Sequence, residues 1–164
     1  MQPQDYSART AYRPPKRLYA RLNRLIGVPL ARLGWTPSDV VSLEVRGRSS
    51  GRTRSTPVVL ARYEGATYVV SLAGEAQWVR NVRADGGRAV LRRRKPVEVI
   101  LEELPVAERA PILAAYLHQS ARRGGDDAAA GQARNYFGLA GTATLEDFAA
   151  IADRYPVFRV RRLA

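Results

Sequence analysis

The sequence predicts an α+β protein, mainly β, built as an antiparallel barrel with flanking helices. Five strand-like runs fall between residues 40 and 104, a sixth lies near the C-terminus, and no regular strand–helix alternation separates them. Strands without that alternation favour antiparallel pairing and barrel closure. The chain of 164 residues is long enough for one such domain. We expect the barrel at residues 36–164, preceded by a helical extension at residues 1–35.

The first expected element is a basic amphipathic helix at residues 12–33. Its apolar residues recur at helical spacing and form one face: Leu18, Leu22, Leu25 and Ile26. Seven basic side chains against Asp5 give residues 1–35 a net charge of +6. Such a helix can lie on an anionic membrane surface or cover the edge of a β-domain. The sequence leaves both interpretations open.

The expected barrel strands follow. A first strand, VVSLEVR, leads into an arginine-rich loop, and two hairpins come next: TPVVLARY with ATYVVSL, and RAVLRR with PVEVILEE. The first hairpin turns at Glu64-Gly65, where glycine can adopt a positive φ, and the second turns at residues 94–95. Between them lies GEAQWVRNVRADGG, in which Trp78 and Val82 are one helical turn apart. This spacing predicts a short helix that joins the hairpins.

The C-terminal third alternates helix and loop before a last strand. The segment VAERAPILAAYLHQSA is predicted to be helical, with Pro111 in the first turn, and RRGGDDAAAG is predicted to be a mobile loop. The segment TLEDFAAIADRY opens with Thr144 and Asp147 at capping-box spacing. Pro156 ends that helix, and VFRVRR alternates as the closing strand.

The composition excludes several kinds of chemistry. The chain has no cysteine and a single histidine, His118. A disulfide framework, a thiolate nucleophile, a zinc site and a histidine-based triad are therefore not expected, and no metal site is predicted. No apolar run approaches the ~20 residues that span a bilayer, and MQPQDYSART lacks the apolar stretch of a secretory signal. These features predict a cytoplasmic protein, membrane-associated if the N-terminal helix meets a bilayer.

The net charge of +12 calls for an anionic partner or reflects a bias of composition. Nucleic acid, an anionic membrane and an anionic small molecule would all suit it. The arginines, however, are spread over several elements, and no helix-turn-helix, zinc-finger or RNA-recognition signature is present. The sequence therefore predicts no specific nucleic-acid partner.

The segment RGRSSGRTRSTPVV places arginines and glycines directly before an apolar run. Gly47 and Gly51 permit a tight turn whose backbone N–H groups can face an anion. Arg48 and Arg54 offer planar guanidinium groups for bidentate pairing, and neighbouring serines add hydroxyl donors. The loop is therefore either a cradle for an anionic ligand or a solvated turn.

Several segments together resemble the deazaflavin-dependent nitroreductase family of split β-barrel oxidoreductases: GRSSGRTRSTPVV, a hairpin ending at Ser71, WVRNVRADGG, ERAPILAAYL and YPVFRV. The resemblance spans roughly residues 40–162. It implies a split β-barrel that binds coenzyme F-420, an 8-hydroxy-5-deazaflavin with a phosphate and carboxylates in its tail. The matching positions imply a cofactor-binding set: Arg48, Ser49, Ser50, Gly51, Arg54, Thr56, Pro57, Val58, Ser71, Trp78 and Asn81.

Two departures from the family pattern bear on the choice of cofactor. Ser49 and Leu72 stand where many members carry lysine, which removes two cationic partners for the tail. FMN, which some split-barrel relatives use, is therefore the alternative cofactor. The alternative function is a non-catalytic barrel that binds a lipid, a fatty acid or another flavin.

The resemblance also implies the reaction. Such enzymes transfer a hydride from the reduced deazaflavin to an electron-poor small molecule, here a quinone, an enone or a nitro compound, while the protein orients the reactants. The proton comes from water or from a tyrosine, for which Tyr116 and Tyr136 are candidates. Phe148 stands where nitro-reducing members favour tyrosine, so nitroimidazole reduction is not assumed. Split-barrel relatives often form dimers, and a homodimer is expected.

Overall fold

We analysed a computed structural model of the chain, which describes residue 29 and residues 38–163. The predicted N-terminal helix and the proposed boundary at residue 35 lie outside the described residues. Within those residues, no helix is both long and apolar enough to cross a membrane.

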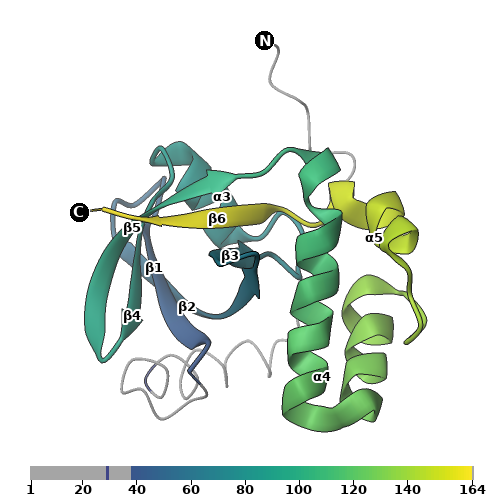
Figure 1. The fold of residues 1–164 in the computed structure, drawn as a ribbon. Helices are drawn as coiled ribbons and strands as arrows, with labels where there is room; N and C mark the ends of the chain where they lie inside the picture. The colour runs from purple at the N-terminus through teal and green to yellow at the C-terminus, as the bar shows by residue number, and fades with distance from the viewer. Residues whose placement is uncertain (1–28, 30–37, 164) are drawn as a thin grey trace.

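The described chain forms a closed barrel of six antiparallel strands, and the helices within residues 110–151 lie together on one side of it (Figure 1). Around the barrel the strand order is β1-β2-β3-β6-β5-β4. The last strand closes the barrel because it pairs with β3 on one side and with β5 on the other. The strands are β1 (Val40–Arg46), β2 (Thr53–Tyr63), β3 (Ala66–Val70), β4 (Arg88–Arg93), β5 (Lys95–Glu103) and β6 (Val157–Arg162). The predicted fold class is therefore confirmed.

The hairpin turns lie where the sequence predicts them. Glu64 and Gly65 both adopt positive φ between β2 and β3, and Arg94 does so between β4 and β5. The first strand of the β2–β3 hairpin begins earlier than expected, because Thr53 already pairs with Arg46 of β1. The arginine-rich loop is therefore short, running from residue 47 to residue 52, and Arg54 belongs to a strand.

Within residues 38–163, three helices and three short helical turns accompany the barrel. The helices are α3 (Gln77–Ala84), α4 (Ala110–Gln132) and α5 (Leu145–Ile151), and the turns are η3 (Val106–Glu108), the π-helical η4 (Ala133–Phe137) and η5 (Ala152–Arg154). The predicted capping box is present, because the Thr144 side chain accepts from the Asp147 backbone and the Asp147 carboxylate accepts from the Thr144 backbone. The hydrogen bond from the Thr144 backbone lowers the pKa of Asp147.

The prediction of a mobile loop at RRGGDDAAAG is wrong, because this segment is part of α4. Each glycine costs a helix about 1 kcal/mol relative to alanine. Extending a helix that has already formed is much easier than starting one, however, and three alanines follow the glycines. The buried residues Ala133 and Phe137 of η4 then hold the far end of α4 against the rest of the molecule.

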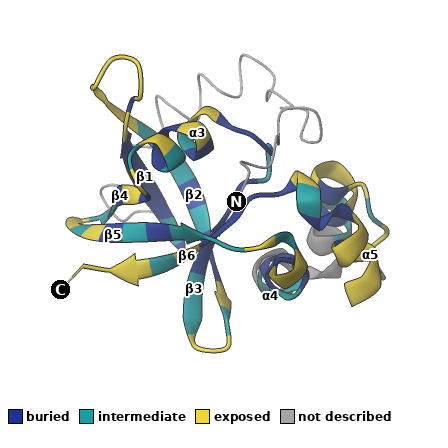
Figure 2. Cartoon of the chain, turned by 90° about the horizontal axis from the view of Figure 1, so that it is seen from above, coloured by how far each residue is buried: buried dark blue, intermediate teal, exposed yellow. Residues whose placement is uncertain are grey.

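Two hydrophobic clusters organise the described residues (Figure 2). One fills the barrel and includes Leu43, Val69 and Val99. The other joins the barrel to α4 and α5 and includes Leu113 and Phe148, both almost fully buried. A fully buried side chain of this size contributes roughly 1.5–3 kcal/mol. The second cluster therefore holds the helices firmly beside the barrel.

A chain of charged groups connects α3 to the rest of the fold. Arg83 of α3 bridges Glu75 and Glu103, with nitrogen–oxygen distances of 2.7 Å to each carboxylate. Glu103 also pairs with Arg109, whose side chain is only 1% exposed and whose Nε donates to the carbonyl of Leu104 at 2.9 Å. The hydrogen bond with Glu103 raises the pKa of Arg83. These ion pairs hold α3 in place, and α3 carries residues of the candidate functional site.

Candidate functional site

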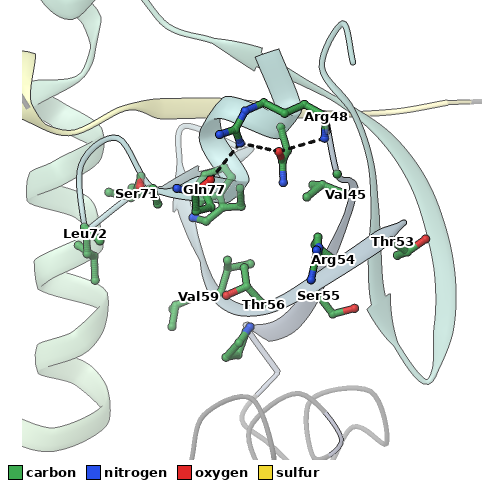
Figure 3. Close-up of a pocket in the computed structure, with 18 of the residues that line it drawn as sticks. Val45, Arg48, Thr53, Arg54, Ser55, Thr56, Val59, Ser71, Leu72 and Gln77 are labelled. Atoms are coloured by element: carbon green, nitrogen blue, oxygen red, sulfur yellow. Dashed lines mark hydrogen bonds between the residues drawn. The ribbon is translucent and has the colours of Figure 1, made fainter. Parts of the chain in front are cut away.

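The main candidate site is a cavity of about 900 Å³ on the side of the barrel (Figure 3). Its walls come from the arginine-rich loop, from β2, from the end of β3 and the turn after it, and from α3. Two tyrosines, Tyr116 of α4 and Tyr136 of η4, complete the lining. The site therefore combines segments far apart in the sequence.

Ten of the eleven residues predicted to bind a cofactor line this cavity: Arg48, Ser49, Ser50, Arg54, Thr56, Pro57, Val58, Ser71, Trp78 and Asn81. Gly51 does not. Its φ of +63° and the hydrogen bond from its N–H to the Gly47 carbonyl (2.8 Å) give it a role in the turn. Both tyrosine candidates also line the cavity. The structure thus brings the set together, and cofactor contact by each residue remains a prediction.

The tight turn of the loop differs in one respect from the prediction. The N–H groups of Gly47 and Gly51 do not face a ligand, because they donate to the carbonyls of Arg52 and Gly47 at 2.9 and 2.8 Å. In the described part of the chain, the N–H groups of Ser49 and Ser50 have no acceptor. The donors that the loop leaves available to a ligand are therefore the N–H groups of these two serines and the arginine side chains.

Arg48 anchors the loop to α3. Its backbone N–H and its Nη1 both donate to the Asn81 side-chain carbonyl, at 3.3 and 2.9 Å, and Nη1 also donates to the Gln77 side chain at 3.0 Å. Figure 3 shows the Arg48 side chain reaching across the top of the cavity toward Gln77. Asn81 is 5% exposed, so the anchor is partly shielded from water. Arg48 and Asn81 thus bind each other.

Arg54 differs from Arg48 in its surroundings. It lies on β2 opposite Val45 of β1, next to Ser55 and Thr56 on the same wall of the cavity (Figure 3). Its side chain is exposed, and it has no ion pair or hydrogen-bond partner among the described residues. Arg54 can therefore pair with a bound anion without breaking an existing contact.

The far wall of the cavity is largely apolar. Trp78 is half-buried, and its ring packs on Phe158 with 5.4 Å between centroids. Leu72, which follows β3, and Val59, on the same strand as Arg54 and Thr56, also contribute apolar side chains to the lining (Figure 3). Ser71 is 1% exposed, and its hydroxyl donates to the Gly74 carbonyl at 2.6 Å. The Ser71 side chain therefore stabilises the turn after β3.

Gln77, which accepts a hydrogen bond from Arg48, is not among the site residues predicted from the sequence. A signal was available, because Gln77 lies four residues before Asn81 and so shares its helix face. The predicted cofactor-binding set also leaves out other lining residues: Val45, Gly47, Thr53, Ser55, Val59, Val70, Leu72, Ala73 and Ala76. Most of these are small or apolar, and in the sequence they resemble ordinary barrel residues.

The two tyrosines differ in accessibility. Tyr116 is 5% exposed and packs edge-on against Phe137. Tyr136 is 38% exposed and lies in the π-helical turn, where its carbonyl accepts a hydrogen bond from the Tyr155 hydroxyl. His118, the single histidine, is exposed on α4. Among the described residues, no cluster of acidic or histidine side chains could hold a metal ion.

A closed antiparallel barrel with an arginine-rimmed, partly apolar cavity beside one short helix has the architecture of a split β-barrel oxidoreductase. The chain belongs to the F420H(2)-dependent quinone reductase family, whose family model matches residues 11–129. It is an oxidoreductase, and its cofactor is coenzyme F-420. The expected family resemblance is therefore confirmed.

Solved structures of similar fold include a protein of unknown function, Atu2129 from Agrobacterium tumefaciens, with 15% identity and a TM-score of 0.52 over 94% of this chain and 58% of that chain. A protein solved as a domain-swapped dimer is 17% identical, with a TM-score of 0.50 over 90% of this chain and 100% of that chain. The F420-H2 dependent reductase FDR-A is 19% identical, with a TM-score of 0.47 over 76% of this chain and 95% of that chain. No curated protein is significantly similar to the chain.

The cavity suits coenzyme F-420. Its volume of about 900 Å³ lies within the range of roughly 300–1,000 Å³ that is common for small-molecule sites. The unpaired guanidinium of Arg54 and the serines of the loop match an anionic tail, and Trp78 with the apolar wall matches a flat ring system. Ser49 and Leu72 stand where many family members carry lysine, so the cationic groups at the rim of this cavity are arginines.

Proposed function

We propose that the protein transfers a hydride from reduced coenzyme F-420 to a small electron-poor acceptor, with a quinone as the first choice and an enone or a nitro compound as alternatives. The observation that carries this proposal is the division of the cavity into a cationic rim and an apolar wall. The quinone preference comes from the family to which the chain belongs.

In this proposal, the loop and the first part of β2 bind the cofactor tail. Arg54 pairs with an anionic group, and the serines at positions 49 and 50 donate from their backbone and hydroxyl groups. Arg48, held by Gln77 and Asn81, keeps the loop over the cavity. Charged hydrogen bonds of this kind are about twice as strong as neutral ones, so the rim supplies most of the polar binding energy.

The apolar wall orients the reactants. Pro57, Val58 and Trp78 support the ring system and exclude water from one of its faces. Coenzyme F-420 in its reduced form supplies the hydride when bound. Holding two reactants in contact geometry can lower the barrier by several kcal/mol, so the chain needs no nucleophilic side chain for this reaction.

A quinone that accepts a hydride also needs a proton to become a hydroquinone. Of the two candidates, Tyr136 suits proton delivery better, because its exposure lets the hydroxyl exchange its proton with water. Tyr116 is packed against Phe137 and suits a role in shaping the cavity. We expect Tyr136→Phe to slow acceptor reduction while leaving cofactor affinity unchanged.

The decisive experiment is a parallel titration of the purified protein with coenzyme F-420 and with FMN, followed by tryptophan fluorescence and calorimetry. We expect coenzyme F-420 to quench the tryptophan fluorescence saturably and FMN to bind more weakly. The Trp78→Phe variant identifies the responding tryptophan, because Trp35 is the other one in the chain. Absence of binding by coenzyme F-420 in both measurements would overturn the proposal.

The acceptor is identified by anaerobic oxidation of reduced coenzyme F-420 in the presence of a naphthoquinone, a cyclic enone or a nitroimidazole. We expect the quinone to react fastest. Retention of a fatty acid in the first cavity, with reduced coenzyme F-420 neither bound nor oxidised, would instead favour the non-catalytic alternative.

We also propose that the protein forms a homodimer. The support is its structural similarity over 90% of the chain to a protein solved as a domain-swapped dimer. Light scattering coupled to size-exclusion chromatography tests this, and a monomeric mass at all accessible concentrations would contradict it.

A further inference from the structure

A second cavity, of about 780 Å³, lies where α4 faces the end of β2 and the start of α5. Its lining residues are Arg62, Tyr63, Glu64, Pro111, Ala114, Ala115, His118, Gln119, Arg122 and Leu145. None of them lines the cavity assigned to the cofactor. The second cavity therefore needs an explanation of its own.

The side of this cavity formed by α4 is apolar at one end and basic at the other. The α4 residues that line it are spaced three or four apart and so form a single stripe. The stripe begins with Pro111 and small alanines and ends with His118 and Arg122. At 1.5 Å per residue it is roughly 16 Å long. An elongated ligand on this stripe would meet an apolar surface at one end and a basic surface at the other.

The strand side of the cavity adds a second arginine at the basic end. The Gln119 side chain accepts from the Arg62 backbone N–H at 3.2 Å, so Arg62 is held beside this part of α4. The same amide donates to Asp39 at 2.6 Å and to the Leu60 carbonyl at 2.9 Å. These three bonds hold β2 and α4 at a fixed spacing, so the cavity does not depend on a mobile loop.

The arginines of this cavity are available to a ligand. Arg62 and Arg122 are exposed, and neither has an ion pair among the described residues. One carboxylate, Glu64, is also present in the lining, and a hydrogen bond with it raises the pKa of Tyr63. The lining therefore contains two arginines and one carboxylate.

The apolar part of the cavity has an unusual feature. Leu145 is 57% exposed and is one of few large hydrophobic side chains at the surface of the described chain. It lies in the first turn of α5, where a polar residue would serve the helix equally well. A ligand with an apolar body would remove Leu145 from water, at roughly 25 cal/mol for each Å² covered.

We propose that this second cavity is a binding site for a small amphipathic carboxylate, such as a medium-chain fatty acid. The carboxylate lies between Arg62 and Arg122, and the hydrocarbon body lies along the alanines of α4 and against Leu145. A carboxylate matches the planar guanidinium geometry, and the length of the stripe matches a chain of about ten carbons, each adding roughly 1.3 Å.

Titration of the full chain with decanoate, followed by calorimetry, tests the proposal. We expect saturable binding with one site per chain, and much weaker binding of decylamine, which has the same hydrocarbon body and the opposite charge. The double variant Arg62→Gln/Arg122→Gln should lose about tenfold or more in affinity, as expected for charged hydrogen bonds. Leu145→Ser should weaken binding as well, because it removes apolar contact.

The Arg54→Gln variant is the matched control, because it makes the same chemical change in the cofactor cavity. Its decanoate affinity should equal that of the unmodified protein, and saturating coenzyme F-420 should not displace decanoate. No saturable binding would overturn the proposal, as would equal affinity in the double variant with its fold intact by thermal unfolding. Displacement by the coenzyme would assign decanoate to the first cavity and overturn it too.

Discussion

Arg48 and Arg54 show how the same residue type takes different roles within one short segment. Arg48 donates three hydrogen bonds to the amide side chains of α3 and so holds the loop in place. Arg54 lies on a strand beside the cavity with no partner among the described residues. Their neighbours in space therefore give Arg48 an anchoring role and leave the Arg54 guanidinium available for the ligand binding proposed above.

The first prediction concerns direct binding by Arg54. Arg54→Ala should weaken coenzyme F-420 binding by about tenfold to over a hundredfold, because one charged hydrogen bond contributes roughly 1.5–3 kcal/mol. The melting temperature should hardly change, since exposed substitutions usually alter stability by no more than ~0.5 kcal/mol. Arg52→Ala is the control, because Arg52 is exposed in the same loop and does not line the cavity. Equal affinity losses in both variants would point to general electrostatic attraction.

The second prediction concerns the anchor. Gln77→Ala leaves the charge of Arg48 in place and removes one acceptor of its Nη1. Such a bond contributes about 1 kcal/mol, so coenzyme affinity should fall by roughly fivefold, with faster proteolysis of the loop. Arg48→Ala should cause a larger loss of affinity. An unchanged affinity in both variants would show that loop order does not matter for binding.

At the level of elements, the junction between α3 and β4 positions the helix that carries Gln77, Trp78 and Asn81. Gly87 donates to the Val82 carbonyl and accepts from the Leu101 N–H, both at 2.8 Å, and so connects α3 to β5. Its φ is +83°, and an added Cβ would lie 2.7 Å from the Leu101 carbonyl oxygen. Gly86, with φ +62°, has open space around the same position.

These two glycines form a matched pair for the third prediction. Gly86→Ala should lower the free energy of unfolding by about 1–2 kcal/mol, the cost of a left-handed conformation for alanine. Gly87→Ala adds a clash with backbone that cannot move freely, and should cost at least about 2 kcal/mol more. Urea denaturation measures both values. Equal losses would mean that β5 shifts to accommodate the methyl group.

At the level of the whole molecule, both hydrophobic clusters of the described residues draw on positions 41–158. The fourth prediction concerns residues 1–35: their deletion should preserve a cooperative thermal transition, because the described strands already close a barrel around a core, and should weaken any binding to anionic vesicles. The reason is the +6 charge and apolar face of that segment. Full-length protein carrying Arg17→Gln and Arg21→Gln should lose vesicle binding in the same direction. Loss of the cooperative transition on deletion would place the segment in the core.

The six strands, the turns at Gly65 and Arg94, and the capping box at Thr144 could all be predicted from the sequence. These features depend on local chemistry: alternation of apolar residues, freedom of φ and side-chain bonds to nearby backbone. The same local reasoning failed at residues 122–131, where glycines indicated a loop. The propagation of α4 and the burial of Phe137 beyond it outweigh that local preference.

The family and its cofactor could also be inferred from the sequence, because the arginine-rich loop and the Trp78–Asn81 pair are contiguous motifs at a set spacing. Tertiary structure decided what each residue does. Only the closed barrel brings the loop at residues 47–52 against α3, so that Gln77 and Asn81 hold Arg48. Only the packing of α4 against β2 forms the second cavity. Contacts between residues 29 to 80 positions apart depend on the register of strands and helices, which no local pattern encodes.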